Sequence, residues 1–175
     1  MRNIIKPNFL ISILSCIITL FIFYLSLNQA VWFRFWSFLS IPPQPAFSDL
    51  KAHVYFFECF EIGIDIFKEK CTLIPAGGGA ISTHPSIWLD IVKVFKLNNE
   101  VFINSFVLIS YFLYFFYLLN FFRIFKSKES KFFLLFFIFS TTNFILIERF
   151  STDLIIFIIV CSIFYFNSNI IRFIL

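Results

Sequence analysis

This chain of 175 residues is 60% hydrophobic and only 14% charged, and 31 of its residues are Phe. A composition this apolar excludes an ordinary soluble domain and predicts an all-α, polytopic protein embedded in the lipid bilayer. The formal net charge of +4 is not arranged as a basic stripe or an aromatic–basic patch, so nothing indicates a nucleic-acid partner.

The first predicted element is a membrane helix over residues 9–27. This apolar run follows Arg2 and Lys6, and at about 1.5 Å per residue it is long enough to cross a bilayer. The alternative is a cleaved secretory signal. However, Asn28 stands where a cleavage site needs a small residue, so an uncleaved helix is favoured.

Residues 28–100 form the only extended polar segment, and they include every Gly, all three Trp, both His and seven of the ten acidic residues. A membrane protein can carry ionisable groups at low cost only where water reaches them, so this segment is the candidate functional region. Residues 31–39 contain Trp32, Arg34 and Trp36, a composition typical of the membrane–water interface. Three prolines in residues 42–45 then end any helix.

An amphipathic helix is predicted from Ser48 to about residue 70. Ser48 is a suitable N-cap, and Asp49 lies in the first turn, where the helix dipole favours a carboxylate. Its charged residues are most simply a solvated edge on a helix that lies at the membrane surface. The expected apolar face consists of Phe56, Cys59, Phe60, Gly63, Ile64 and Phe67, and the charged face of Lys51, Glu58, Glu61, Asp65 and Lys68.

Cys59 and Cys71 fall in the polar segment, and they either form a disulfide or remain separate thiols. Cys16 and Cys161 lie in apolar runs and are expected to be small core residues. The glycine triplet at residues 77–79 could approach a phosphate, but the Lys and Ser/Thr of a nucleotide-binding loop are missing, so a flexible loop is favoured. A second interfacial helix is expected over residues 86–97.

Three further membrane spans are expected over residues 101–122, 132–147 and 153–166. Short loops rich in Lys and Arg stay in the cytoplasm, which places the N-terminus, the basic loop 123–131 and Arg172 on that side. Residues 28–100 and the charged turn 148–153 then share the extracytoplasmic side of an inner or plasma membrane. The chain is therefore expected to be a single membrane domain with four spans, and it is short enough to be part of a larger protein.

Three short motifs fall in the segments expected on the outer side. They are Phe47-Ser48-Asp49-Leu50 after the first span, His84-Pro85-Ser86-Ile87-Trp88, and Glu148-Arg149-Phe150-Ser151-Thr152-Asp153. Together they resemble the GT-C class of polytopic membrane glycosyltransferases, in its mannosyltransferase-like branch. The first motif corresponds to the acidic residue in the first outer loop of that class. The second resembles a Tyr-Pro-x-x-Trp element with His in place of Tyr, and the third a Glu-Arg-Gly-Asn-x-Asp element with Phe150 and Ser151 in place of Gly and Asn. The similarity covers only what would be the N-terminal part of such a protein.

The resemblance implies transfer of a sugar from a polyprenyl-phosphate donor to an extracytoplasmic glycan or lipid acceptor. Asp49 would be the catalytic base, and His84, Glu148, Arg149 and Asp153 would contact substrate, with Arg149 and His84 near the phosphate. No cofactor is implied, and the sequence has no Asp-x-Asp pair to hold a metal.

Each of these residues also has an ordinary interpretation. Asp49 could be a simple helix-start carboxylate, Arg149 could pair with Asp153 four residues on, and His84 could be structural. Charged residues this close to hydrocarbon are usually paired or functional.

Two other functions compete with glycosyl transfer. The chain could be a non-enzymatic membrane subunit whose outer amphipathic helices dock a partner. It could also be a fragment of a transporter or flippase. If it is one part of a split enzyme, it would be inactive alone.

Overall fold

The computed structural model describes residues 5–41, 44–74, 82, 86–124 and 127–174. These residues form α-helices and no β-strand, which confirms the all-α class. The helices are α1 (Ile5–Ser26), α2 (Gln29–Phe38), α3 (Ser48–Glu61), α4 (Ile87–Val94), α5 (Glu100–Ile124), α6 (Lys128–Ile138), α7 (Thr141–Arg149) and α8 (Thr152–Ile174).

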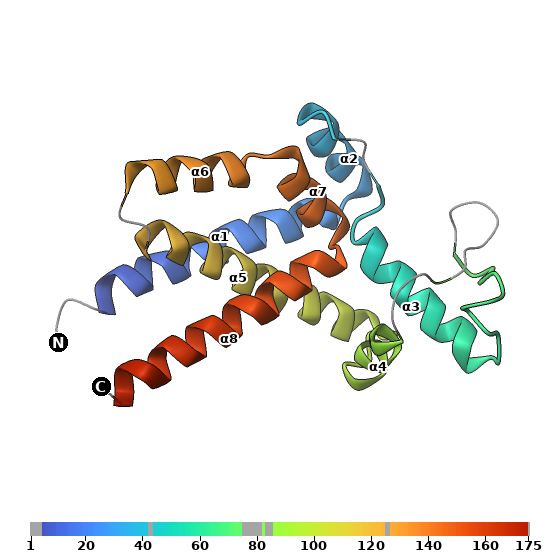
Figure 1. The fold of residues 1–175 in the computed structure, drawn as a ribbon. Coiled ribbons are helices and arrows are strands. Elements are labelled where there is room, and N and C mark those ends of the chain that lie inside the picture. Colours follow the sequence, from blue (N-terminus) through green and yellow to red (C-terminus); the bar gives the residue numbers. More distant parts are fainter. Residues whose placement is uncertain (1–4, 42–43, 75–81, 83–85, 125–126, 175) are drawn as a thin grey trace.

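The long helices α1, α5 and α8 form a bundle in which α1 and α8 both pack on α5. In Figure 1, α1 and the α6–α7 pair run toward the end of the bundle where α3 lies, and α5 and α8 run away from it. Helices α2, α3 and α4 and the junction between α7 and α8 gather at this end, which we call the α3 end. The fold thus brings the polar segment and the charged turn 148–153 to one end of an apolar bundle.

Two helices in the described part of the chain are long and apolar enough to cross a membrane, over Phe9–Ser26 in α1 and Glu100–Phe121 in α5. They match the expected runs 9–27 and 101–122. Large apolar side chains of α1 remain exposed along its length, as expected where the surrounding medium is hydrocarbon. They are Phe9, Leu10, Ile13, Leu14, Ile17, Leu20, Phe21 and Tyr24.

The expected span 132–147 is not one continuous helix. Helix α6 ends at Ile138 and α7 begins at Thr141, because Ser140 adopts extended geometry and its hydroxyl accepts a hydrogen bond from the Asn143 N–H at 3.2 Å. Such a side-chain cap favours a new helix start over continuation. In place of the run 153–166, α8 starts at Thr152, and the apolar part of it that the structure describes in full covers Thr152–Ile163.

Helix α3 differs from its prediction at both ends. Ser48 is its first residue and not its cap; the cap is Phe47, in left-handed geometry with φ 61°. The helix stops at Glu61 instead of continuing to residue 70, because the chain turns at Gly63 with φ 90°, a conformation that is cheap only for glycine. Only part of the expected apolar face is buried: Phe56 and Cys59 are buried, whereas Phe60 in the last turn of α3 and Phe67 beyond the helix are exposed.

The two Trp residues of the segment expected at the membrane–water interface turn their side chains into the protein interior. Trp32 and Trp36 on α2 are 0% and 1% exposed, and their rings meet edge to face with centroids 5.3 Å apart. Trp32 also contacts Phe47, and Trp36 contacts Phe144 of α7. Helix α2 therefore directs both Trp rings into the protein core, one toward the residue before α3 and one toward α7.

The structure pairs Cys59 with Cys71 in a disulfide whose Cα atoms are 5.8 Å apart. The bridge ties the turn after Gly63 back to the end of α3 and, with Phe56 and Ile66, makes a small separate core. Cys161 is a free buried cysteine as expected, whereas Cys16 is exposed on α1, so its expected core role is wrong.

Removal of this disulfide should loosen the segment beyond α3 and leave the bundle folded. Closing a loop of this length contributes up to about 3 kcal/mol, or about a hundredfold in local opening. In a Cys59→Ser/Cys71→Ser variant, a Lys-specific protease should cleave at Lys68 and Lys70, both exposed, about a hundred times faster than in the wild type. Cys16→Ser is the control and should leave the cleavage rate unchanged. Equal rates for the bridged and unbridged proteins would contradict this role.

Candidate functional site

Two acidic residues from distant parts of the sequence come together at the α3 end of the bundle. Asp49 lies half-buried in the first turn of α3, and Glu148 lies near the end of α7, which packs against α3. The two carboxyl groups are close enough that the charge of Asp49 raises the pKa of Glu148.

Glu148 is completely buried. Its Oε1 accepts a hydrogen bond of 2.5 Å from the backbone N–H of Gln44, and its Oε2 lies 3.6 Å from Nε of Arg149. The helix ends directly afterwards because Phe150 adopts left-handed geometry with φ 54°. The turn thus directs Glu148 inward while the Arg149 side chain stays partly exposed.

Burial is the largest cause that raises the pKa of Glu148, since a carboxylate loses hydration in the interior. The Asp49 charge acts in the same direction. The Gln44 N–H and the Arg149 guanidinium oppose both effects by stabilising the anion, and the net result is a pKa above the ordinary value of 4.5.

This raised pKa predicts a pH-dependent stability. Between 4.5 and the raised pKa, the folded protein binds more protons at this position than the unfolded chain does, so stability falls as pH rises through this window. A Glu148→Gln variant should lack this contribution, and its melting temperature should rise relative to the wild type as pH increases from 4 and then level off. Thermal unfolding in detergent across pH 4–8 measures the difference. A difference in melting temperature between the variant and the wild type that stays the same from pH 4 to pH 8 would contradict the prediction.

An aromatic cluster underlies the two carboxyl groups. The Phe47 ring lies 5.9 Å from Trp32, 6.1 Å from Tyr111 and 6.2 Å from Phe150, measured between ring centroids. The Tyr111 hydroxyl donates a hydrogen bond to the carbonyl of Ile147, one residue before Glu148. The sequence does not reveal this cluster, because aromatic residues are so frequent in this chain that none stands out.

The residues expected to contact substrate are only partly brought together. Arg149 pairs with Glu148 and not with Asp153, because α7 ends and the helical spacing between them is interrupted at Phe150. Asp153 is exposed in the first turn of α8, where its N–H donates to the Ser151 hydroxyl at 3.2 Å. His84 and the glycine triplet 77–79 lie outside the described residues.

The other histidine, His53 on α3, is buried and stacks on Trp88 of α4. This contact is part of the packing between the two helices. The His53 ring lies 5.1 Å from that of Trp88 with an angle of 18° between the planes. The sequence places His53 on the expected apolar face, three residues before Phe56 and seven before Phe60, where a histidine does not stand out as a site residue.

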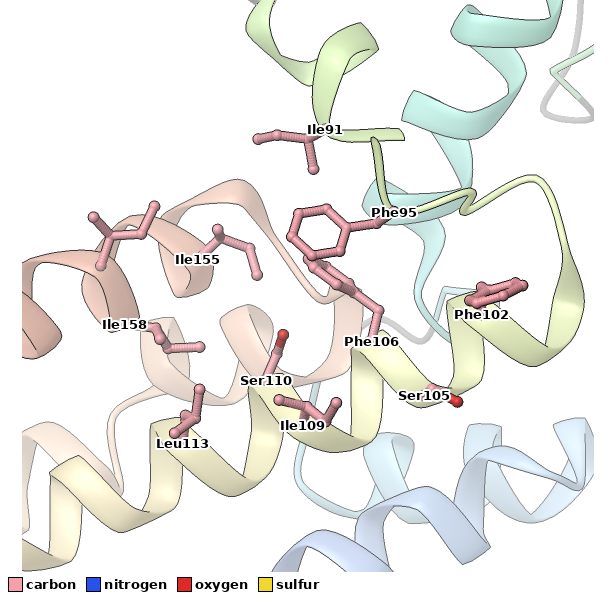
Figure 2. A pocket seen from close by; sticks show the side chains of 11 residues that line it. Ile91, Phe95, Phe102, Ser105, Phe106, Ile109, Ser110, Leu113, Ile155 and Ile158 are labelled. Carbon is pink, nitrogen blue, oxygen red and sulfur yellow. The ribbon is translucent and has the colours of Figure 1, made fainter. Parts of the chain in front are cut away.

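An apolar cavity of about 490 Å³ opens beside this site, between α4, α5 and α8 (Figure 2). Phe106 stands at one side of it, 5.2 Å from Phe95 and 6.0 Å from Phe150, so one aromatic ring connects the cavity to the turn that carries Glu148. The Ser105 hydroxyl is already bonded to the Val101 carbonyl, which leaves a lining suited to a hydrocarbon group. The lining consists of Ile91, Phe95, Phe102, Ser105, Phe106, Ile109, Ser110, Leu113, Ile155, Ile158 and Ile159.

Within the described residues, no three His, Cys, Asp or Glu side chains are grouped so as to hold a metal ion. The chemistry available at the α3 end is therefore that of Asp49, a buried carboxyl group, a partly exposed guanidinium and an adjacent apolar cavity. Comparison with protein-family models, with curated proteins and with solved structures finds no match to this chain.

Proposed function

We propose that this chain takes part in an inverting transfer of a sugar from a polyprenyl-phosphate donor to an extracytoplasmic glycan or lipid acceptor. The proposal rests first on the grouping of Asp49, Glu148 and Arg149 at one end of an apolar bundle. Charged groups gathered this close to hydrocarbon are costly unless they serve a function. Asp49 is only half-buried, so an acceptor can approach it.

In the proposed reaction, the acceptor hydroxyl oxygen attacks the anomeric carbon and the bond from that carbon to the phosphate oxygen breaks. The phosphate leaves with the bonding electron pair, and the hydroxyl proton passes to the Asp49 carboxylate. Arg149 provides a guanidinium that can stabilise the charge on the departing phosphate, since part of its side chain is exposed. Asp153 and His84 remain proposed substrate contacts.

The apolar cavity supports a lipid-linked donor over a nucleotide sugar. Its lining provides hydrocarbon surface and almost no polar atoms for a base or ribose. Phe106 lines the cavity and lies 6.0 Å from Phe150 between ring centroids, and Phe150 directly follows Arg149. A prenyl chain in the cavity would therefore bring its phosphate toward the charged turn.

The proposed function requires the α3 end to face outward, with four membrane crossings. The third crossing is the run 132–147, which is broken between α6 and α7 and ends before Glu148. This arrangement is supported by the alternating directions of α1, α5, the α6–α7 pair and α8 in Figure 1. In sealed vesicles whose extracytoplasmic side faces outward, protease added outside should cut after Lys68 and Lys70 and spare Lys128 and Lys131. The reverse cleavage pattern would contradict the orientation.

The direct test compares native membranes from cells with and without the gene, so that any partner of a split enzyme is present. Both are supplied with polyprenyl phosphates that carry radiolabelled mannose, glucose or galactose. The proposal expects donor consumption, and transfer of label to lipid or polymer, only in membranes that contain the chain. Equal consumption of every donor in both membranes would contradict it.

A second candidate function is that of a non-enzymatic subunit. It is favoured by exposed apolar residues on the last turn of α3 and on the disulfide-braced segment that follows this helix and projects from the bundle in Figure 1. These residues are Phe60, Ile62, Phe67 and Leu73. Exposed apolar groups on a projecting segment are typical of docking surfaces. A partner that co-purifies with the wild type and is lost from a Phe60→Ser/Ile62→Ser variant would support this function.

A further inference from the structure

The segment 44–47, which leads into α3, is held through both backbone polar groups of one residue, Gln44. The N–H of Gln44 donates to Oε1 of Glu148 at 2.5 Å, and the carbonyl of Gln44 accepts from the indole N–H of Trp32 at 3.1 Å. Both side chains are fully buried, and they come from α7 and α2. A buried bond to a charged acceptor is among the stronger hydrogen bonds in proteins.

The same segment is fixed again three residues later. Phe47 is buried in left-handed geometry, and its ring contacts Trp32, Tyr111 and Phe150. A non-glycine residue adopts this backbone conformation only when the surrounding structure enforces it. Asp49 lies two residues further on, so its position depends on these anchors.

We propose that Glu148 is a positioning residue, whose buried carboxyl group anchors Gln44 and thereby holds Asp49 in the geometry required for proton transfer. The inference rests on the proposed function, because it concerns the base of that reaction. Glu148 itself does not contact substrate: it is completely buried, and the groups around it are Gln44, Arg149, Asp49 and Tyr111. This assignment differs from the substrate contact that the sequence resemblance implies for Glu148.

Two substitutions of Glu148 separate the effect of its hydrogen bond to Gln44 from the effect of its negative charge. Glu148→Gln keeps a carbonyl oxygen that can accept from the Gln44 N–H, whereas Glu148→Ala removes the acceptor. The alanine variant should lose about a hundredfold in kcat per folded molecule, as expected for a displaced catalytic group, with little change in KM for the donor. The glutamine variant should retain most of the wild-type kcat.

Trp32→Phe provides a second, independent test of the anchor, because it removes the hydrogen bond to the Gln44 carbonyl and keeps an aromatic ring in the core. If both side chains act through Gln44, the effects of Trp32→Phe and Glu148→Ala on kcat should not multiply in the double variant. Independent, multiplicative losses would overturn a shared anchor.

Hydrogen exchange of peptides that cover residues 44–49 reports the anchor without any need for activity. The Gln44 amide should be protected in the wild type and in Glu148→Gln, and it should exchange rapidly in Glu148→Ala while α5 stays protected. Unchanged protection in Glu148→Ala, or lost protection with unchanged kcat, would overturn the positioning role. Absence of transfer by wild-type membranes would instead overturn the proposed function, and with it the catalytic part of this inference, while the exchange data would still report the anchor.

Discussion

Replacement of Asp49 by Asn is expected to reduce sugar transfer by about 10²–10⁴-fold, the usual contribution of a positioned general base. Asn has nearly the same shape but cannot take up the proton that the acceptor hydroxyl loses. The measurement is the turnover of labelled polyprenyl-phosphate sugar in native membranes, normalised to the amount of folded chain. The matched control is Asp90→Asn, which neutralises an exposed carboxylate in the first turn of α4.

The stability of the same variant separates the catalytic role from the ordinary one. A carboxylate in the first turn of a helix contributes about 0.3–1 kcal/mol through the helix dipole, so Asp49→Asn should lower the melting temperature only slightly. A variant that is slightly less stable and transfers sugar at the wild-type rate would show that Asp49 is only a helix-start carboxylate. The Asp90→Asn control should keep full activity.

Replacement of Trp32 by Ala is expected to cause the largest loss of stability among single substitutions on α2, about 3–5 kcal/mol. The Trp32 side chain is completely buried and contacts Trp36 and Phe47. Truncation would leave a large cavity and remove the donor that satisfies the Gln44 carbonyl. The control is Phe38→Ala on the same helix, where the side chain is 85% exposed and the expected change is within about 0.5 kcal/mol.

Thermal or denaturant unfolding in detergent measures both variants, and the comparison also decides where α2 lies. If the Trp residues sat at the membrane–water interface, as their composition suggests, Trp32→Ala and Phe38→Ala would have similar small effects in detergent. Similar effects would therefore contradict the buried position of Trp32. A loss several kcal/mol larger for Trp32→Ala supports the core position of α2.

The sequence alone determined the class of the protein and its two clearest apolar helices. Helix α1 and helix α5 could be predicted because spanning length and apolar composition are local properties of a continuous run. The concentration of charge in residues 28–100 and 148–153 could also be read directly. The placement of Asp49 in the first turn of a helix follows from its neighbours, and the structure contains that helix.

The sequence alone failed where geometry depends on contacts between distant residues. The end of α3 at Glu61 depends on the turn at Gly63, and that turn is braced by the Cys59–Cys71 bridge, whose formation the spacing left open. The break between α6 and α7 occurs inside a run that looks like one span, because a single serine cap interrupts it.

The site itself was decided by the tertiary structure. The sequence identified Asp49 and Glu148 separately, but only the packing of α7 on α3 buries Glu148 and bonds it to Gln44. The aromatic rings of Trp32, Phe47 and Phe150 could equally well have faced lipid, since hydrophobicity does not distinguish a protein core from a bilayer. Composition therefore determined that the chain is helical and membrane-like, and the packing of α2, α3 and α7 determined which of its few charged groups are buried together.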